Sequence, residues 1–259
     1  MQLHDQTESP RLRVARRRIA STRVVTLGEL ADDEREALCA RSFALYTRYK
    51  SGVQRATFDR QFFADDAARA AFFYGEDGAF AGFSCASRLR VGHAGQVHAV
   101  FTAPLFIDTD YRGSREAARF ALGEALRCKL REPWTPMAYL GVVTSPASYR
   151  MLATAMPTVY PRRDAPTPAA VDSLVRAVAA RRGLVFADEE RWLVRGLGAV
   201  REPGRLLRSE ALRRAPEAQF YVEQNPGFRD GMALLTWVPL TLGNLGGGLA
   251  RLARRAPGG

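Results

Sequence analysis

The residues best suited to chemistry lie in the segment DTDYRGSREAARF (108–120), where an expected strand turns into an expected helix. The start of a helix presents backbone N–H groups that have no intrahelical partner and carries a partial positive charge. Such a turn can hold an anion, and a pyrophosphate in particular. Arg112 and Arg115 flank the turn and would add charge-assisted hydrogen bonds to phosphate oxygens. The pattern therefore predicts a phosphate-binding turn.

Candidates for proton transfer lie on either side of this turn. Tyr149 lies in a short expected helix, and its phenol could donate a proton; the alternative is that it packs against the preceding helix. His98 has a titration range that suits a general base, with a structural, hydrogen-bonded histidine as the alternative. Glu116 suits the dipole at a helix start, and Asp108 and Asp110 suit a turn or a cap.

Metal and disulfide chemistry find no support in the spacing of ligand residues. The three cysteines lie far apart without a C-x-x-C pair, and the three histidines lack metal-ligand spacing. We expect inert thiols and no metal site. The residues concerned are Cys39, Cys85, Cys128, His4, His93 and His98.

The composition is that of a folded protein with a strong positive charge. The 259 residues are 47% hydrophobic and 25% charged, with a formal charge of +11 at pH 7. Such an excess favours anionic partners: phosphate-bearing cofactors, acidic carrier proteins, membrane surfaces or nucleic acid. No stretch reaches the roughly 20 apolar residues of a membrane span, and no apolar segment follows the charges of residues 1–18. We expect a cytoplasmic protein, with peripheral membrane contact left open.

Hydrophobic periodicity predicts an alternation of helices and strands. After a basic arm (1–20), helices are expected over 31–50, 56–70, 115–130 and 167–183, with a short one from Pro146. Strands are expected over 22–27, 71–74, 79–91, 96–107, 137–143, 219–223 and 232–240. A helix that joins strands 96–107 and 137–143 makes them parallel. We predict a mixed α/β sheet in one domain, residues 21–259, with a helical insertion over 161–218.

The order of these elements resembles the GNAT (GCN5-related N-acetyltransferase) superfamily over roughly residues 22–160. The hairpin FFYGEDGAFAGFSCASRL is similar to the family's second and third strands. DTDYRGSREAARFAL is similar to its cofactor motif, R/Q-x-x-G-x-G/A. The match covers Arg112, Gly113, Ser114, Arg115, Glu116 and Ala117. Its first and last positions agree, but Arg115 stands where the family prefers glycine, and the family's asparagine ahead of the tyrosine is absent.

The resemblance implies a GNAT-like fold in which a bulge, here near Pro104, splays two parallel strands so that an acyl thioester lies between them. It implies an N-acyltransferase that uses acyl-CoA or an acyl-carrier protein as donor and an amine as acceptor, without a metal. Phe106, Ile107 and residues 112–117 would contact the donor, Tyr149 would protonate the leaving thiolate, and His98 would serve as base.

One refinement and two alternatives accompany this hypothesis. The apolar, arginine-rich C-terminal part favours a long acyl chain or a lipid-like acceptor. The alternative function is an inactive GNAT-like module that binds a lipid, nucleotide or protein, which Arg115 and the missing asparagine would support. Nucleic-acid binding rests on charge alone and ranks last, because no nucleic-acid-binding motif is visible.

Overall fold

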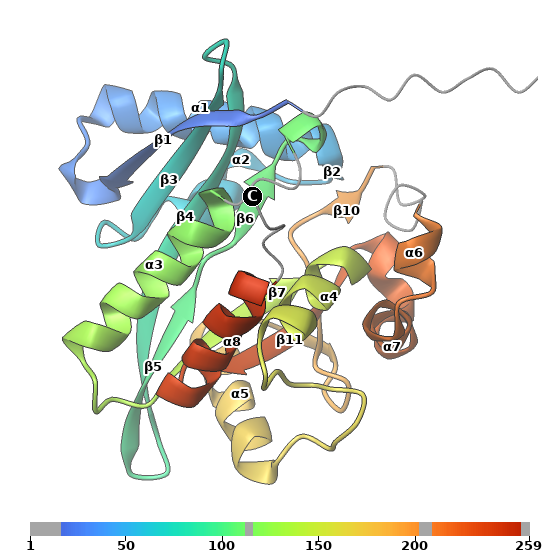
Figure 1. The fold of residues 1–259 in the computed structure, drawn as a ribbon. Helices are drawn as coiled ribbons and strands as arrows, with labels where there is room; N and C mark the ends of the chain where they lie inside the picture. The colour runs from blue at the N-terminus through green and yellow to red at the C-terminus, as the bar shows by residue number, and fades with distance from the viewer. Residues whose placement is uncertain (1–16, 112–115, 202–208, 255–259) are drawn as a thin grey trace, which may run out of the picture.

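A mixed β-sheet forms the centre of the protein, in a computed structural model that describes residues 17–111, 116–201 and 209–254 (Figure 1). The strand order is β1-β3-β4-β5-β7-β11-β9-β8, and β6 pairs with β4 off this path. The mixed α/β class predicted from the sequence is confirmed. The strands are β1 (Ile19–Thr26), β3 (Arg69–Gly75), β4 (Phe80–His93), β5 (Gln96–Thr102), β6 (Leu105–Ile107), β7 (Met137–Val143), β8 (Phe186–Asp188), β9 (Leu193–Arg195) and β11 (Met232–Pro239).

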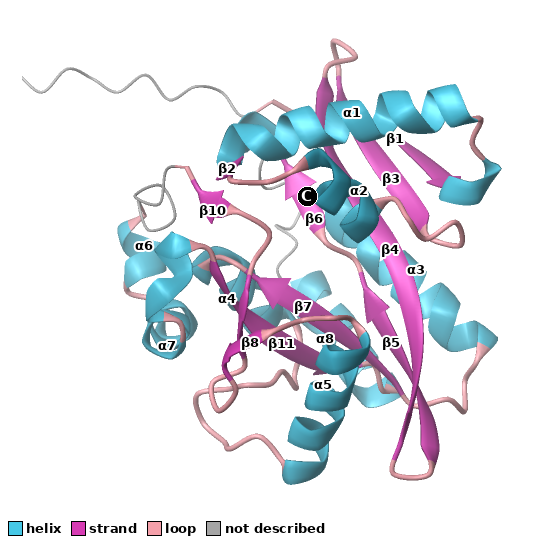
Figure 2. Ribbon diagram, turned by 180° about the vertical axis from the view of Figure 1, so that it is seen from behind, coloured by secondary structure: helices cyan, strands magenta, loops and turns pink. Residues whose placement is uncertain are grey.

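Helices cover both faces of the sheet. On the face nearer the viewer in Figure 1, here called the front, lie α3 (Glu116–Arg131), α4 (Pro146–Ala155) and α8 (Leu242–Arg254). The back carries α1 (Asp32–Tyr49), α2 (Arg55–Phe62) and α5 (Ala169–Arg181), as Figure 2 shows. Because both faces are covered, β3 is apolar without alternation, and Ala70–Phe73 are all fully buried.

The crossover from β5 through α3 to β7 is present as predicted. β5 and β7 pair in parallel, while β4–β5, β3–β4, β1–β3, β11–β7, β11–β9 and β8–β9 pair antiparallel. The front face of β5 and β7 and the inner side of α3 enclose a core that includes Phe101, Tyr111, Phe120 and Met137. This unit positions the candidate site.

The C-terminal part differs from the prediction in two ways. Residues 161–218 are partly strand, since β8, β9 and β10 (Ala199–Val200) accompany α5 and α6 (Glu210–Arg213), and β10 pairs with β2 (Lys50–Ser51) in a small second sheet. The strand predicted over 219–223 is wrong, because these residues belong to α7 (Pro216–Gln224). Ala218 and Tyr221 lie one turn apart and are buried, a helical spacing that a five-residue apolar run conceals.

The N-terminal arm ends earlier than predicted. Ile19 and Ala20 already belong to β1, and residues 1–16 lie outside the described residues. Arg17 forms an ion pair with Asp77, and its guanidinium lies over the Tyr111 ring, 5.2 Å from the centroid. The described end of the arm is therefore fixed to the sheet.

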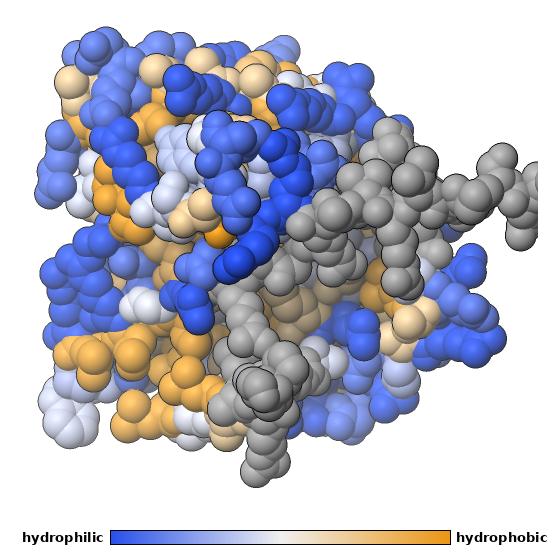
Figure 3. Space-filling view, turned by 45° about the horizontal axis from the view of Figure 1, so that its top comes forward, coloured by the Kyte–Doolittle hydropathy of each residue, from blue (hydrophilic) through white to orange (hydrophobic). Residues whose placement is uncertain are grey.

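Most of the surface in Figure 3 is hydrophilic, and the hydrophobic areas include one over the C-terminal end of α3 and the start of α8. None of the helices in the described ranges combines the length and the apolar character that a bilayer crossing requires.

Candidate functional site: the fork between β6 and β7

β5 and β7 begin side by side and then diverge. They pair at three positions, Ala99–Met137, Val100–Ala138 and Phe101–Tyr139. Beyond these, the chain continues from β5 into β6, which pairs with β4, while β7 continues to Val143 beside β11. We call the region between β6 and the second half of β7, where the two strands no longer pair, the fork, and Figure 1 shows the two strands diverging there. The splayed parallel pair expected from the sequence is present.

Pro104 lies where the strand divides. Asp108 N donates to Ala81 O on the β4 side at 2.8 Å. In an antiparallel strand every second residue directs its N–H and C=O groups to the same neighbour, so the even-numbered residues here face β4. Pro104 falls on a position that faces β4, but proline has no N–H to donate. The strand is therefore interrupted at this residue.

The interruption is not the bulge that the sequence suggested. Ser87 pairs with Thr102 and Ser84 pairs with Leu105. Two residues separate the paired positions on both strands, so neither strand carries an inserted residue, which is what defines a bulge. The missing donor at Pro104 interrupts the ladder with β4 without a change of register.

One edge of the fork consists of backbone groups from β6 and the residue that precedes it. By the same alternation, the N–H and C=O groups of Ala103, Leu105 and Ile107 point away from β4 and towards the fork. The 2.8 Å bond from Ala99 N to Pro136 O agrees with this alternation, because it shows that the backbone groups of the odd-numbered residues of β5 face β7. These amides can stabilise an oxyanion or a carbonyl oxygen placed in the fork.

The second half of β7 supplies the opposite edge. Leu240 N donates to Met137 O at 2.8 Å, which turns the odd-numbered residues of β7 towards β11. The carbonyl of Leu140 and both backbone groups of Val142 are then directed towards the fork, because the Leu140 N–H belongs to the last pair with β5. The fork is thus lined on both sides by groups that could bind an extended, amide-containing ligand.

Close packing of β6 on β4 holds the fork open. A Cβ atom at Gly82 would overlap the Phe106 carbonyl oxygen and lie 2.6 Å from Ile107 Cδ1, so only glycine permits this approach. The Phe106 ring packs on Tyr46 and Phe83, at centroid distances of 4.6 and 5.1 Å. The side chain of Phe106 is therefore an anchor for β6. The fork-facing backbone next to it, at Ile107, is what a ligand would contact.

The predicted phosphate-binding turn is only partly described. Residues Thr109–Tyr111 form a 3₁₀ turn that leads towards α3, and Arg112, Gly113, Ser114 and Arg115 lie outside the described residues. Asp108 is buried and accepts a hydrogen bond from Arg48 at 2.9 Å and one from Asp110 N at 3.1 Å.

The last two predicted contacts of this turn lie on α3. Glu116 begins the helix and pairs with Arg119 at 2.7 Å. Ala117 follows it in the first turn, where backbone N–H groups lack intrahelical partners.

Tyr149 is buried away from solvent, and its hydroxyl already has a partner. The hydroxyl donates to the Pro161 carbonyl at 2.8 Å, and the rings of Phe220 and Tyr221 lie within 5.8 Å. Burial, with a smaller effect from Glu217, raises its pKa. The packing interpretation that the sequence left open describes this residue.

His98 lies away from the fork. It precedes the three paired positions of β5 and β7, whereas the fork opens after them. Its ring lies 6.4 Å from that of His93, whose Nε2 is 3.0 Å from Ser173 Oγ on α5. Burial and the nearby His93 lower the pKa of His98. The structure does not bring His98 and Tyr149 together at the fork.

Tyr139 is a site residue that the sequence interpretation missed. Residues two apart on a strand share a face, and the Tyr139 ring leans over Gly141, where a Cβ atom would lie 3.1 Å from Cε1 and 3.4 Å from the hydroxyl oxygen. Within the described residues this hydroxyl makes no hydrogen bond. Burial raises the pKa of Tyr139 to about 12. The signal was the Y-L-G triplet in MAYLGVV, which places a tyrosine and a glycine on the same face.

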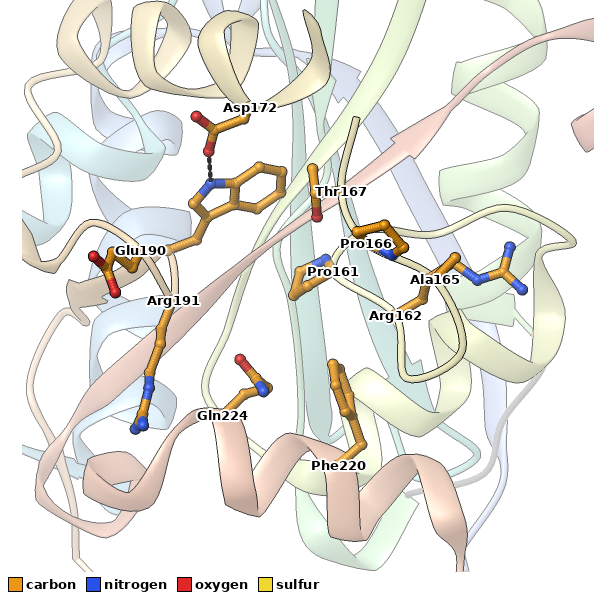
Figure 4. A pocket seen from close by; sticks show the side chains of 11 residues that line it. Pro161, Arg162, Ala165, Pro166, Thr167, Asp172, Glu190, Arg191, Phe220 and Gln224 are labelled. Carbon is orange, nitrogen blue, oxygen red and sulfur yellow. Dashed lines mark hydrogen bonds between the residues drawn. The ribbon is translucent and has the colours of Figure 1, made fainter. Parts of the chain in front are cut away.

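A separate cavity of about 320 Å³ lies between the 161–167 loop, α5, α7 and the turn before β9 (Figure 4). Two of its charged groups are engaged: Arg162 pairs with Asp164, and Asp172 accepts a 2.7 Å hydrogen bond from Trp192 Nε1. β11 and β9 separate it from the fork in the sheet order. Nor do the described residues contain a group of three or more ligands that could hold a metal.

No protein-family model matches the chain, and neither does any curated protein. Among solved structures it is similar to a ribosomal-protein-alanine N-acetyltransferase from Brucella melitensis biovar Abortus 2308 (17% identity, 46% of this chain and 78% of that one, TM-score 0.31). It is also similar to a GCN5-related N-acetyltransferase from Kribbella flavida (11% identity, 85% of this chain and 98% of that one, TM-score 0.37). A third similar structure is a putative acetyltransferase from Acinetobacter baylyi ADP1 (12% identity, 86% of this chain and 93% of that one, TM-score 0.33).

TM-scores of this size identify neither a substrate nor site residues. The mixed sheet, the crossover helix and the forked parallel pair are properties of this chain's own topology. Together they make up the GNAT-like fold expected from the sequence.

Proposed function

We propose that this protein is an N-acyltransferase that moves an acyl group from acyl-CoA to an amine at the fork. The observation that carries the proposal is the divergence of β6 from β7 after Phe101 and Tyr139, which leaves backbone N–H groups facing an opening. Polarised donors fixed before the reaction are what a developing oxyanion requires. The start of α3, just beyond Tyr111, is the site proposed for the phosphates of the donor.

The chemistry is a direct displacement. The neutral amine attacks the thioester carbonyl carbon, a C–N bond forms, and the carbonyl oxygen becomes an oxyanion that Ala103, Leu105 or Ile107 N–H can hold. The C–S bond then breaks, the thiolate takes a proton, and the nitrogen releases one to solvent. Positioning of the two reactants would supply much of the rate.

Tyr139 is the residue we assign to the proton that the thiolate takes. Its hydroxyl lies beside the vertex of the fork and has no competing partner among the described residues. A pKa of about 12 keeps it protonated at neutral pH. Tyr149, which the sequence favoured for this role, commits its proton to Pro161.

An acyl chain longer than acetyl is the proposed donor subclass. Leu105 and Val142 stand on opposite edges of the fork, and their exposed fractions are 37% and 39%. By alternation Leu105 projects from the front face and Val142 from the back face, so an apolar chain that passes through the fork would cover each of them in turn. The acceptor is proposed only as an amine, lipid-like or small.

Thiol release is the direct test. The protein would be incubated with acetyl-, octanoyl- or palmitoyl-CoA and a panel of amines, with free thiol and acylated amine measured together, and with acyl-carrier protein as a second donor. Amine-dependent release that exceeds hydrolysis is expected. Calorimetric binding of acyl-CoA without release for any amine would favour the inactive binding module. If the protein neither binds acyl-CoA nor releases thiol, the donor assignment is refuted.

A further inference from the structure

Four large apolar side chains project from one end of the molecule. Leu126, Leu130 and Trp134 follow one another at four-residue spacing along α3 and the turn beyond it, with exposed fractions of 39%, 67% and 93%. Leu242, the first residue of α8, is 73% exposed. We call these four residues the Trp134 patch.

The patch is continuous because the end of β11 meets the start of β7. Leu240 N donates to Met137 O at 2.8 Å, which brings the residues before Leu242 beside those that follow Trp134. Lys129 Nζ donates to Thr135 O at 3.0 Å and fixes the turn that carries Trp134. Figure 3 shows the resulting hydrophobic area over α3 and α8.

The surroundings of the patch are basic. Residues 124–132 of α3 and the next turn contain Arg127, Lys129, Arg131, Glu124 and Glu132. Their ion-pair partners from the sheet are arginines: Arg69 with Glu124, and Arg88 and Arg90 with Glu132. These eight residues carry six positive and two negative charges, a local excess of four.

We propose that the Trp134 patch docks the protein on an anionic lipid surface. Leucine and tryptophan side chains that project from a helix end can enter the headgroup region, and tryptophan favours that interface. The arginine excess matches the negative surface potential of acidic lipids. Such a large exposed tryptophan with few neighbours suits insertion into a soft layer better than packing against a second folded surface.

Tryptophan fluorescence provides a direct readout. The chain has three tryptophans, and Trp192 and Trp237 are buried, with exposed fractions of 2% and 4%. A blue shift of the emission upon addition of vesicles would therefore report on Trp134. The titration would use vesicles of phosphatidylcholine with 30 mol% phosphatidylglycerol, and phosphatidylcholine vesicles as the neutral counterpart.

We expect binding and a blue shift with the anionic vesicles only, and binding that weakens as salt rises. In flotation assays Trp134→Ser and Leu130→Ser should each lower vesicle affinity at least tenfold. The matched control is Val185→Ser, which removes a 75% exposed apolar side chain on a loop outside the patch. Thiol release with a soluble amine should be the same in all three variants, which separates this test from that of the proposed function.

Three outcomes would overturn the proposal. One is the absence of wild-type binding to either vesicle, and another is equal binding by Trp134→Ser. The third is a wild-type dimer in light scattering that Trp134→Ser dissociates, which would make the patch a surface for a second copy of this chain.

Discussion

Phe101 lies opposite Tyr139 at the last position where β5 and β7 run side by side, and their ring centroids are 6.2 Å apart. Each strand takes a different partner beyond this pair. The two residues therefore mark the vertex of the fork, and a group placed in the opening would lie beside the Tyr139 hydroxyl. The predictions below test this arrangement and the forces that maintain it.

Replacement of the two tyrosines separates the two candidates for the acid. Tyr139→Phe should lower kcat by about 10²-fold, the scale of a lost general acid, with little change in the free energy of unfolding. Tyr149→Phe should keep its activity and lose about 1 kcal/mol of unfolding free energy, because the Pro161 carbonyl loses its donor. Steady-state kinetics and urea unfolding of both variants measure this. The reverse pattern would return the role to Tyr149.

The pH dependence of the reaction follows from the same phenol. An acid works while it is protonated, so activity that depends on Tyr139 falls only as pH approaches its pKa of about 12. No falling limb from this group is expected between pH 7 and pH 10, when the rate is measured with a saturating amine. A falling limb near pH 8 that disappears in Tyr139→Phe would show that the pKa of Tyr139 is not raised.

Pro104→Ala restores a donor that faces β4. One additional backbone hydrogen bond is worth about 1 kcal/mol, and the loss of proline's restriction on the unfolded chain costs about 0.4–1 kcal/mol. The free energy of unfolding should therefore change by less than about 1 kcal/mol. Hydrogen exchange should show a newly protected amide at position 104. Fast exchange at this amide would mean that the absent N–H is not what interrupts the strand.

Gly141→Ala should disturb Tyr139. The added Cβ atom would lie 3.1 Å from Tyr139 Cε1 and 3.2 Å from Val143 Cγ2, and crowding of this kind costs about 1–3 kcal/mol. We expect a lower free energy of unfolding and a lower kcat. The control is Gly123→Ala on α3, where a Cβ atom meets nothing within 4 Å. That variant should gain up to about 1 kcal/mol and keep its activity.

Lys50 should reduce stability at neutral pH. Its side chain is buried, its Nζ has no hydrogen-bond partner among the described residues, and burial lowers its pKa from 10.5 to about 8. The unfolded chain then binds more protons between pH 8 and pH 10.5, so stability rises with pH in that window. Below pH 8 the charged lysine costs about 3 kcal/mol.

Lys50→Met should therefore be more stable than the wild type at pH 7, and most of this difference should disappear by pH 10. Urea unfolding of both proteins at the two pH values measures this difference in unfolding free energy. Contributions from groups that titrate in both proteins cancel in the difference. An equal difference at both pH values would show that Lys50 is not desolvated.

Local sequence patterns were sufficient to predict the N-terminal part of the fold, up to β7. The apolar run of β7 and the crossover helix led directly to a parallel pair, and Pro104 marked the place where the strand divides. The 219–223 segment failed because its apolar residues fit a strand and a helix equally well, and only the contact of α7 with Tyr149 decides between them.

The assignment of side chains at the site was harder to predict. Tyr149 and Tyr139 are equally plausible acids in the sequence, since the choice depends on which hydroxyl finds a carbonyl partner after folding. His98 illustrates the same limit, because its place along β5 relative to the fork depends on where pairing with β7 stops. Alternation identifies the face of a strand, whereas the length of the pairing is a tertiary property.

β4 runs without a break from Phe80 to His93 and pairs with β5 on one stretch and β6 on another. One continuous strand thus holds β5 and β6 in a single register. The separation of β6 from β7 is therefore established when the protein folds. An incoming thioester would therefore not need to separate two hydrogen-bonded strands. Its association rate is therefore expected to reflect diffusion and charge, without a slow opening step.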